Sequence, residues 1–213
     1  LLSKKGYIYT DTDENGEDIE EIFTKKDFEK RFFSEETNRK FCQTFFKNAK
    51  KDPYTNEIGK SLIFCVSIKH ARKITQILNQ YAEEYYPGVY QSDFAVQVTS
   101  KVEGSQQHTI DFANNTLNGF SRINENYRTS KTRVCVTVGM MTTGYDCPDL
   151  LNLGLMRPIF SPSDFVQIKG RGTRTHTFVE KYRDEQGEMQ QRRIEKETFK
   201  VFDFFANFQY FEE

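Results

Sequence analysis

The sequence lacks an excess of either charge and any long apolar run. Its 213 residues include 30 Lys and Arg against 31 Asp and Glu, which gives a formal net charge of −1. This balance excludes a uniformly basic protein that coats nucleic acid. No apolar run approaches the roughly 18 residues of a membrane span, and the start LLSKKGYIY has no stretch typical of a signal peptide. We therefore expect a cytoplasmic protein with no membrane partner.

The sequence also lacks clusters of metal-binding residues. Its cysteines are Cys42, Cys65, Cys135 and Cys147, and its histidines are His70, His108 and His176. Because they form no CxxC pair and no Cys/His group, neither a zinc site nor a disulfide framework is expected. We expect no metal site, reduced cysteines that pack in the core, and a helix-start or packing role for His70.

A complete ATPase site is absent as well. Gly59-Lys60-Ser61 supplies the end of a GxxxxGK[ST] phosphate loop, but Tyr54 stands where the first glycine belongs. Lys60 also leads into a predicted strand, whereas a phosphate loop opens a helix. Neither an acidic box for Mg²⁺ nor the carboxylate and lysine set of a nuclease is found. Since the sequence also lacks an initiating Met, we expect a fragment of a longer polypeptide that is inactive alone.

The middle of the chain alternates between apolar strands and amphipathic helices. Strands are predicted at 61–66, 94–98, 132–138 and 152–156, and helices over 68–86 and from Ser163 onward. Continuous apolar strands separated by helices predict an α/β fold with a mainly parallel sheet and helices on both faces. Such sheets bind ligands at the carboxyl ends of their strands.

The sequence patterns at the two ends of the chain differ from this alternation. Residues 1–58 are predicted to form an extension, with a hairpin that turns at Asn15-Gly16 and helices within 26–51. Residues 59–213 are predicted to form the main domain. Near its end, 175–182 and 192–205 alternate at period two around a polar loop, which predicts a second hairpin.

The densest basic feature is QIKGRGTR, residues 167–174, which has no acid. On a helix or its last turn, Arg171 and Arg174 are three residues apart and project the same way. Two guanidiniums that point together suit the oxygens of a triphosphate. Gly170 and Gly172 weaken a helix but allow close backbone approach. A solvated basic turn is the alternative.

The segment TVGMMTTGYDCPDLLN, residues 137–152, follows a predicted strand. Its Gly144-Tyr145-Asp146 can offer a backbone N–H and a carboxylate to a nucleotide ribose. Taken alone, a glycine-containing loop in which Asp146 accepts local hydrogen bonds explains the segment better.

Together, the two segments resemble motifs V and VI of superfamily 2 helicases, in that order and at similar separations. The similarity is greatest to the second RecA-like (helicase C-terminal) domain of the motor subunit of type I restriction enzymes, which carries sequences similar to TVGMMTTGYDCP and LMRPIFSPSDFVQIKGRGTR. GKSLIFCVSIKHARKI, residues 59–74, resembles motif IV of that family. The resemblance covers about residues 59–178.

This resemblance implies roles for individual residues. Arg171 and Arg174 would be arginine fingers that act on ATP held by another domain. The residues that would line the nucleotide are Gln167, Gly170, Gly144 and Asp146. Those that would contact the DNA backbone are Ser67, Thr99, Ser100 and Thr137.

The resemblance also implies cofactors and partners. The cofactors are ATP and Mg²⁺, bound mainly by the first RecA-like domain of the same polypeptide. The other partners are double-stranded DNA and the methyltransferase and specificity subunits of a restriction complex. Two alternatives stay open: a domain of a type III restriction or repair helicase, and a non-catalytic α/β module that binds phosphate or nucleic acid.

The first prediction concerns the isolated chain. Because it carries only half of an ATP site, we expect negligible ATP hydrolysis, measured as phosphate release by the purified chain. Hydrolysis at a rate typical of a complete motor would contradict the half-site interpretation.

Overall fold

The computed structural model describes the backbone of residues 7–12, 18–23, 34–139 and 146–212, with side chains from residue 34 to residue 211 outside the gap at 140–145. The chain divides into two compact units, residues 1–40 and 41–213. The domain boundary predicted after residue 58 stays a prediction.

In the first unit, two strands form an antiparallel hairpin. Strand β1 (Tyr7–Thr12) pairs with β2 (Asp18–Phe23) in the register Tyr7 to Phe23. These strands confirm the predicted hairpin. Its Asn15-Gly16 turn and the predicted helical residues 26–33 lie outside the described residues.

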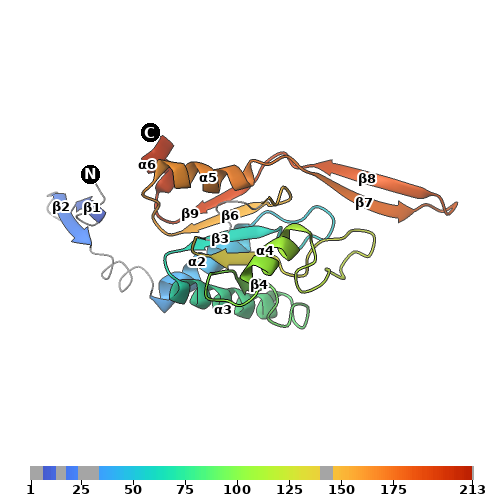
Figure 1. Ribbon diagram of the computed structural model, residues 1–213, viewed down its shortest axis with the longest axis horizontal. Coiled ribbons are helices and arrows are strands. Elements are labelled where there is room, and N and C mark those ends of the chain that lie inside the picture. The colour runs from blue at the N-terminus through green and yellow to red at the C-terminus, as the bar shows by residue number, and fades with distance from the viewer. Residues whose placement is uncertain (1–6, 13–17, 24–33, 140–145, 213) are drawn as a thin grey trace. The chain divides into compact units, whose positions relative to one another are not determined.

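The second unit is built on a five-stranded sheet in which every neighbouring pair is parallel (Figure 1). Its strands are β3 (Ser61–Cys65), β4 (Ala95–Gln97), β5 (Val134–Thr137), β6 (Asn152–Met156) and β9 (Lys200–Asp203). They lie in the order β4-β5-β3-β6-β9. The four strands predicted from apolar runs are all present, and the predicted parallel α/β architecture is confirmed.

Helices cover both faces of this sheet. They are α2 (Glu35–Asn48), α3 (Ile68–Tyr85), α4 (Ser105–Ala113), α5 (Pro162–Gly172) and α6 (Asn207–Glu212). Alternate strand residues point to opposite faces, so Ile63 packs in one buried cluster with Ile74 of α3, and Leu62 in another with Phe165 of α5. No helix in the described parts of the chain is long and apolar enough to cross a membrane.

Aromatic side chains of α2 belong to the first of these clusters. Phe45 lies 5.3 Å from Phe202, and Phe46 lies 5.0 Å from Phe94, measured between ring centroids. Edge and tilted ring pairs at these separations add stability beyond the area that they bury. The aromatic spacing in this part of the sequence therefore marks core, as predicted, and all four cysteines are buried too.

The end of the chain differs from its prediction in one respect. Strands β7 (Thr177–Arg183) and β8 (Met189–Glu195) form the predicted antiparallel hairpin, which extends away from the sheet (Figure 1). Residues 200–203 do not continue β8 as predicted, but form β9 beside β6 in the main sheet. The prediction was wrong there because alternation at period two marks a strand without identifying its partner.

A buried ion pair holds the loops at the amino ends of the strands. The Arg133 side chain is fully buried, and its Nη2 lies 3.3 Å from Asp52 Oδ2. Arg133 also donates to the carbonyl of Ile58 at 2.8 Å and of Ser130 at 2.9 Å. Asp52 Oδ1 accepts hydrogen bonds from the backbone of the following turn. Each charge of the pair is thus compensated inside the fold.

Removing one partner of the Arg133 and Asp52 pair should lower the unfolding free energy far more than removing a charge from an exposed pair. Asp52→Ala leaves the Arg133 guanidinium buried without its carboxylate, and we expect a loss of about 3–5 kcal/mol in unfolding free energy. Lys131→Met is the matched control, because its partner Asp93 is partly exposed and such pairs contribute at most about 1 kcal/mol. Urea unfolding measures both, and equal losses would contradict the prediction.

Candidate functional site

The predicted DNA contacts lie at one edge of the sheet. Ser67 follows β3, Thr99 and Ser100 follow β4, and Thr137 ends β5. These three strands are adjacent and parallel, so their carboxyl ends meet at the same edge. The structure therefore brings together four residues that come from separate parts of the sequence.

Their exposure differs. Ser100 is exposed and Ser67 is half-buried, whereas Thr99 and Thr137 are buried. The Oγ1 atom of Thr99 accepts a hydrogen bond from Gln97 Nε2 at 3.2 Å. Of these four residues, Ser100 and Ser67 are the more exposed ones.

Ser67 also caps the helix that follows it. Its Oγ accepts from the backbone N–H of His70 at 3.2 Å, as expected for a helix N-cap. Burial lowers the pKa of His70 to about 4, so the imidazole is neutral at pH 7, and its Nδ1 accepts from the backbone N–H of Val66 at 3.4 Å. His70 is a buried residue of the first helical turn, which confirms the predicted helix-start or packing role.

Two residues that connect these loops were missed at the sequence level. Gln97 Nε2 donates to the carbonyl of Ile68 at 3.2 Å, which links the end of β4 to the first residue of α3. Arg157 Nη1 donates to the carbonyl of Val138 at 3.0 Å, which links the ends of β6 and β5. Both are polar residues at or just after the end of a strand. That position in the sequence was the feature from which their role could have been predicted.

The basic segment 167–174 occupies the end of α5 and the residues after it. Ser161 caps the start of α5, one turn before the buried Phe165. The helix ends at Gly172, so Arg174 lies beyond it, and a spacing of three no longer forces Arg171 and Arg174 to project together. Gln167 and Arg174 are exposed, while Gly170 and Arg171 are half-buried.

The two predicted nucleotide segments meet at one ion pair. Arg174 Nε lies 3.6 Å from Asp146 Oδ1, and the two side chains are 56% and 67% exposed. Exposed pairs contribute about 0–1 kcal/mol. Either side chain can therefore exchange its partner for a ligand at little cost. Gly144, the other predicted residue of this loop, lies outside the described residues.

The two glycines of the basic segment have different surroundings. A Cβ atom on Gly172 would lie 2.1 Å from the Phe199 ring, whereas nothing lies within 4 Å of the corresponding position on Gly170. Gly172 therefore lets the end of α5 pack against the residue that precedes β9. The open surface at Gly170 is compatible with a ligand.

Lys60 is engaged inside the fold. Its Nζ donates to Asp149 Oδ1 at 3.0 Å and to Asn115 Oδ1 at 2.9 Å, and the side chain is 1% exposed. Burial favours the neutral form of Asp149, but Lys60 and hydrogen bonds from Cys147 and Asn115 outweigh it and lower the pKa of Asp149. Lys60 leads directly into β3, as predicted.

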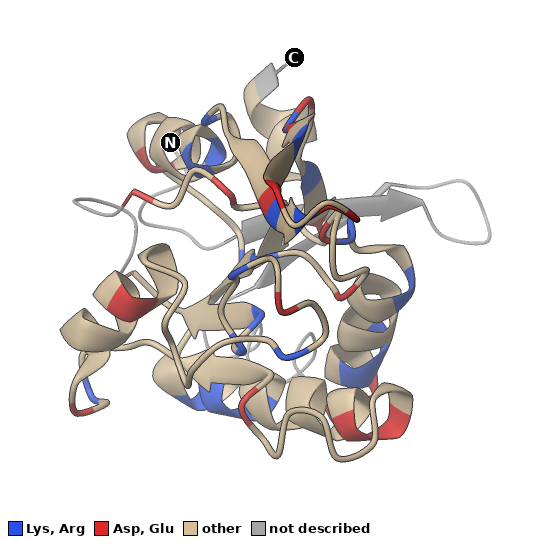
Figure 2. Cartoon of the chain, turned by 90° about the vertical axis from the view of Figure 1, so that its right-hand side faces the viewer, with Lys and Arg blue, Asp and Glu red and all other residues tan. Residues whose placement is uncertain are grey.

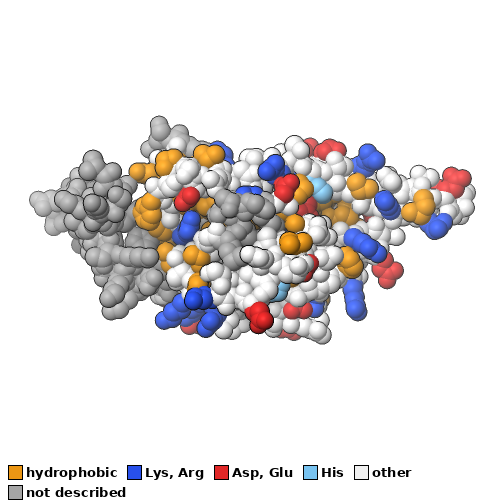
Figure 3. Space-filling view, viewed as in Figure 1, with side chains coloured by type: hydrophobic (Ala, Val, Ile, Leu, Met, Phe, Trp, Pro, Cys, Tyr) orange, Lys and Arg blue, Asp and Glu red, His pale blue; other side chains and the backbone are white. Residues whose placement is uncertain are grey.

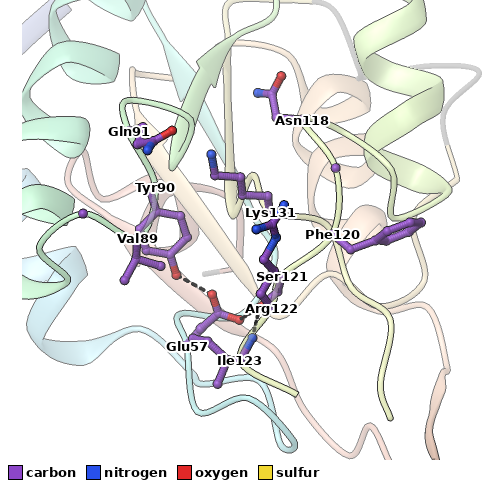
Figure 4. Close-up of a pocket in the computed structure, with 12 residues that line it drawn as sticks. Glu57, Val89, Tyr90, Gln91, Asn118, Phe120, Ser121, Arg122, Ile123 and Lys131 are labelled. Atoms are coloured by element: carbon purple, nitrogen blue, oxygen red, sulfur yellow. Dashed lines mark hydrogen bonds between the residues drawn. The ribbon is translucent and has the colours of Figure 1, made fainter. Parts of the chain in front are cut away.

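A pocket of about 760 Å³ lies at the opposite edge of the sheet (Figure 4). It is lined by segments that precede β3, β4 and β5, and by none of the predicted site residues. Its buried Glu57 accepts hydrogen bonds from the hydroxyls of Tyr90 at 2.6 Å and Ser121 at 2.7 Å. These groups satisfy one another and so have a structural explanation.

Charges are mixed over the described surface. Figure 2 shows Lys and Arg interspersed with Asp and Glu, and Figure 3 shows both kinds along the β7–β8 hairpin. No three His, Cys, Asp or Glu side chains gather as metal ligands in the part of the chain that the structure describes. In these two views, charges of both signs are interspersed and do not form one broad basic surface.

The five-stranded parallel sheet with helices on both faces defines a RecA-like α/β domain, and comparison with known proteins indicates its family. The chain is 26% identical over 173 residues to the type I restriction enzyme EcoKI endonuclease subunit of Escherichia coli K12. It is 30% identical over 166 residues to the EcoAI endonuclease subunit of Escherichia coli. The chain is a homologue of type I restriction enzyme endonuclease subunits, as its motifs predicted.

These alignments cover 81% and 76% of this chain but only 13% and 18% of the relatives. A solved fragment from Vibrio vulnificus YJ016, described as an HsdR subunit of a type I restriction enzyme, matches with a TM-score of 0.53 and 26% identity. That match covers 82% of this chain and 28% of the other. No protein-family model matches the chain.

The two glycines provide a matched test of the packing at the end of α5. The methyl group of Gly172→Ala would overlap the Phe199 ring. We therefore expect a loss of about 1–3 kcal/mol in unfolding free energy. Gly170→Ala meets open space, and should raise the unfolding free energy by up to about 1 kcal/mol through helix propensity. Urea unfolding of both variants measures the difference, and equal effects would contradict it.

Proposed function

We propose that this chain is the second motor domain of an ATP-dependent double-stranded DNA translocase, within the R subunit of a type I restriction endonuclease. The observation that carries the proposal is the contact between Arg174 and Asp146, at 3.6 Å. It joins the two segments that resemble helicase motifs V and VI. The homology to type I endonuclease subunits supports the same assignment.

At this contact, the chain would complete an ATP site formed mainly by the first RecA-like domain of the same polypeptide. Arg171 and Arg174 would stabilise the negative charge that develops on the transferred phosphoryl group, an effect of about 10³–10⁵ in rate. Gln167 and Gly170 of α5, with Gly144 and Asp146 of the loop, would line the nucleotide. Mg²⁺ would be held by the first domain.

At the carboxyl edge of the sheet, the chain would hold the DNA backbone. Ser67, Thr99, Ser100 and Thr137 follow or end adjacent strands. Hydroxyl and backbone donors bind phosphates without reading the base sequence, which suits a protein that moves along DNA. Ser100 and Ser67 would make the first contacts because their side chains are the more exposed ones.

The remaining partners follow from the proposed assembly. A type I complex would supply methyltransferase and specificity subunits, and the specificity subunit would provide sequence recognition. The complex would act in the cytoplasm. Cleavage of DNA would take place in another domain of the subunit.

The test replaces each arginine in the full-length subunit. We expect Arg171→Ala and Arg174→Ala each to lower kcat for ATP by about 10³-fold or more, while ATP binding changes little, because the fingers act on the transition state. Arg192→Ala is the control, since Arg192 is exposed on the hairpin and pairs with Glu180. DNA-dependent phosphate release and nucleotide titration measure the effects.

Unchanged turnover in both finger variants would refute the proposed function. A loss of turnover in Arg192→Ala equal to that of the fingers would show that any surface arginine matters, and would also refute it.

A further inference from the structure

One lysine joins the two segments that form the proposed ATP contact. Lys196 lies between β8 and β9, and its Nζ donates to three backbone carbonyls: Pro148 at 2.9 Å, Gly172 at 2.8 Å and Arg174 at 2.9 Å. An ammonium group has three N–H donors. Each of the three Lys196 donors therefore binds a backbone carbonyl.

These carbonyls come from both sides of the Arg174 and Asp146 contact. Pro148 lies two residues after Asp146, Gly172 ends α5, and Arg174 is itself one of the paired residues. The last carbonyls of a helix have no partner within the helix and favour a nearby cation. Lys196 supplies that cation to α5 and connects it to the Asp146 loop.

The segment around Lys196 is itself held in place. Phe199, three residues later, packs where Gly172 has no side chain, and Lys200 then begins β9 in the main sheet. The ammonium is thus fixed relative to both α5 and the sheet. By contrast, the exposed pair of Arg174 and Asp146 is too weak to set its own geometry.

From this geometry we infer that Lys196 is a positioning residue, which holds the Arg174 backbone against the Asp146 loop so that the arginine reaches ATP. The inference rests on the proposed function. Lys196 would touch neither nucleotide nor DNA, and its effect would appear in turnover rather than in binding of ATP.

The charge of Lys196 gives this role a pH dependence. Burial lowers its pKa to about 8, while Cys147 and Asp149 act in the opposite direction and Lys50 adds to the lowering. The nearby His176 has a lowered pKa too, through burial first, with Lys196 contributing. A neutral amine has only two N–H donors, so above about pH 8 one of the three carbonyls loses its partner.

The unfolding free energy should rise above pH 8, whereas turnover should fall. An unfolded lysine has a pKa of about 10.4, so between pH 8 and that value the unfolded chain binds more protons than the folded chain. The contribution of Lys196 to unfolding free energy then rises with pH. A fall in turnover above pH 8 would therefore not be explained by loss of the fold.

The experiment compares three variants of the full-length subunit. We expect Lys196→Met to lower kcat for ATP about tenfold or more with little change in KM. Lys196→Arg should restore most of kcat and remove the decline above pH 8, because a guanidinium stays charged. Lys200→Met is the control: its Nζ also donates to a backbone carbonyl, that of Asn48 at 2.7 Å, but outside the site, and kcat should not change.

A second measurement uses the chain itself. Amide hydrogen exchange in residues 146–151 and 172–175 should be at least tenfold faster in Lys196→Met than in the parent chain or in Lys200→Met. If Lys196→Met does not fold, the pH profile of Lys196→Arg still decides the question.

An unchanged kcat in folded Lys196→Met, or the same alkaline decline in Lys196→Arg as in the parent, would overturn the inference. Failure of the inference is distinguishable from failure of the proposed function. If Arg174→Ala abolishes turnover and Lys196→Met does not affect it, only the role of Lys196 is wrong.

Discussion

The buried pair of Lys60 and Asp149 is the interaction on which the rest of the structure depends. Lys60 immediately precedes the central strand β3, and Asp149 lies just before the adjacent β6. With Asn115 and the carbonyl of Phe112, at 2.9 and 2.5 Å from Nζ, the pair also holds the end of α4. A buried charge without its partner costs several kcal/mol, so the amino ends of these strands and α4 are constrained together.

This constraint extends to the proposed site through a short segment. Asp149 follows Pro148, whose carbonyl binds Lys196, and Lys196 binds the end of α5. The loop that carries Asp146 is thus anchored by one ammonium inside the core and by another beside α5. The backbone of the exposed Arg174 is thus anchored, which suits its proposed role of contacting a second domain and then releasing it.

Much of the fold could be predicted from the sequence, because its apolar patterns are strong. Runs such as SLIFC and NLGLM identify buried strands, and the helices predicted over 68–86 and from Ser163 begin within one residue of α3 and α5. The strand with which a given strand pairs could not be predicted in the same way. Residues 200–203 alternate as the hairpin does, yet they pair with β6, where Phe202 is buried against Phe45.

Part of the candidate site could be predicted from the sequence alone. The order and spacing of GYD and QIKGRGTR resemble those of helicase motifs V and VI, and homology to type I endonuclease subunits agrees with the family that this resemblance indicated. Only the tertiary structure decided that Gly172 serves packing against Phe199, that Thr137 is buried, and that Lys196 joins both segments. The physical reason is that local patterns encode a residue's own backbone, whereas a hydrogen bond across more than twenty residues depends on how the whole sheet brings distant loops together.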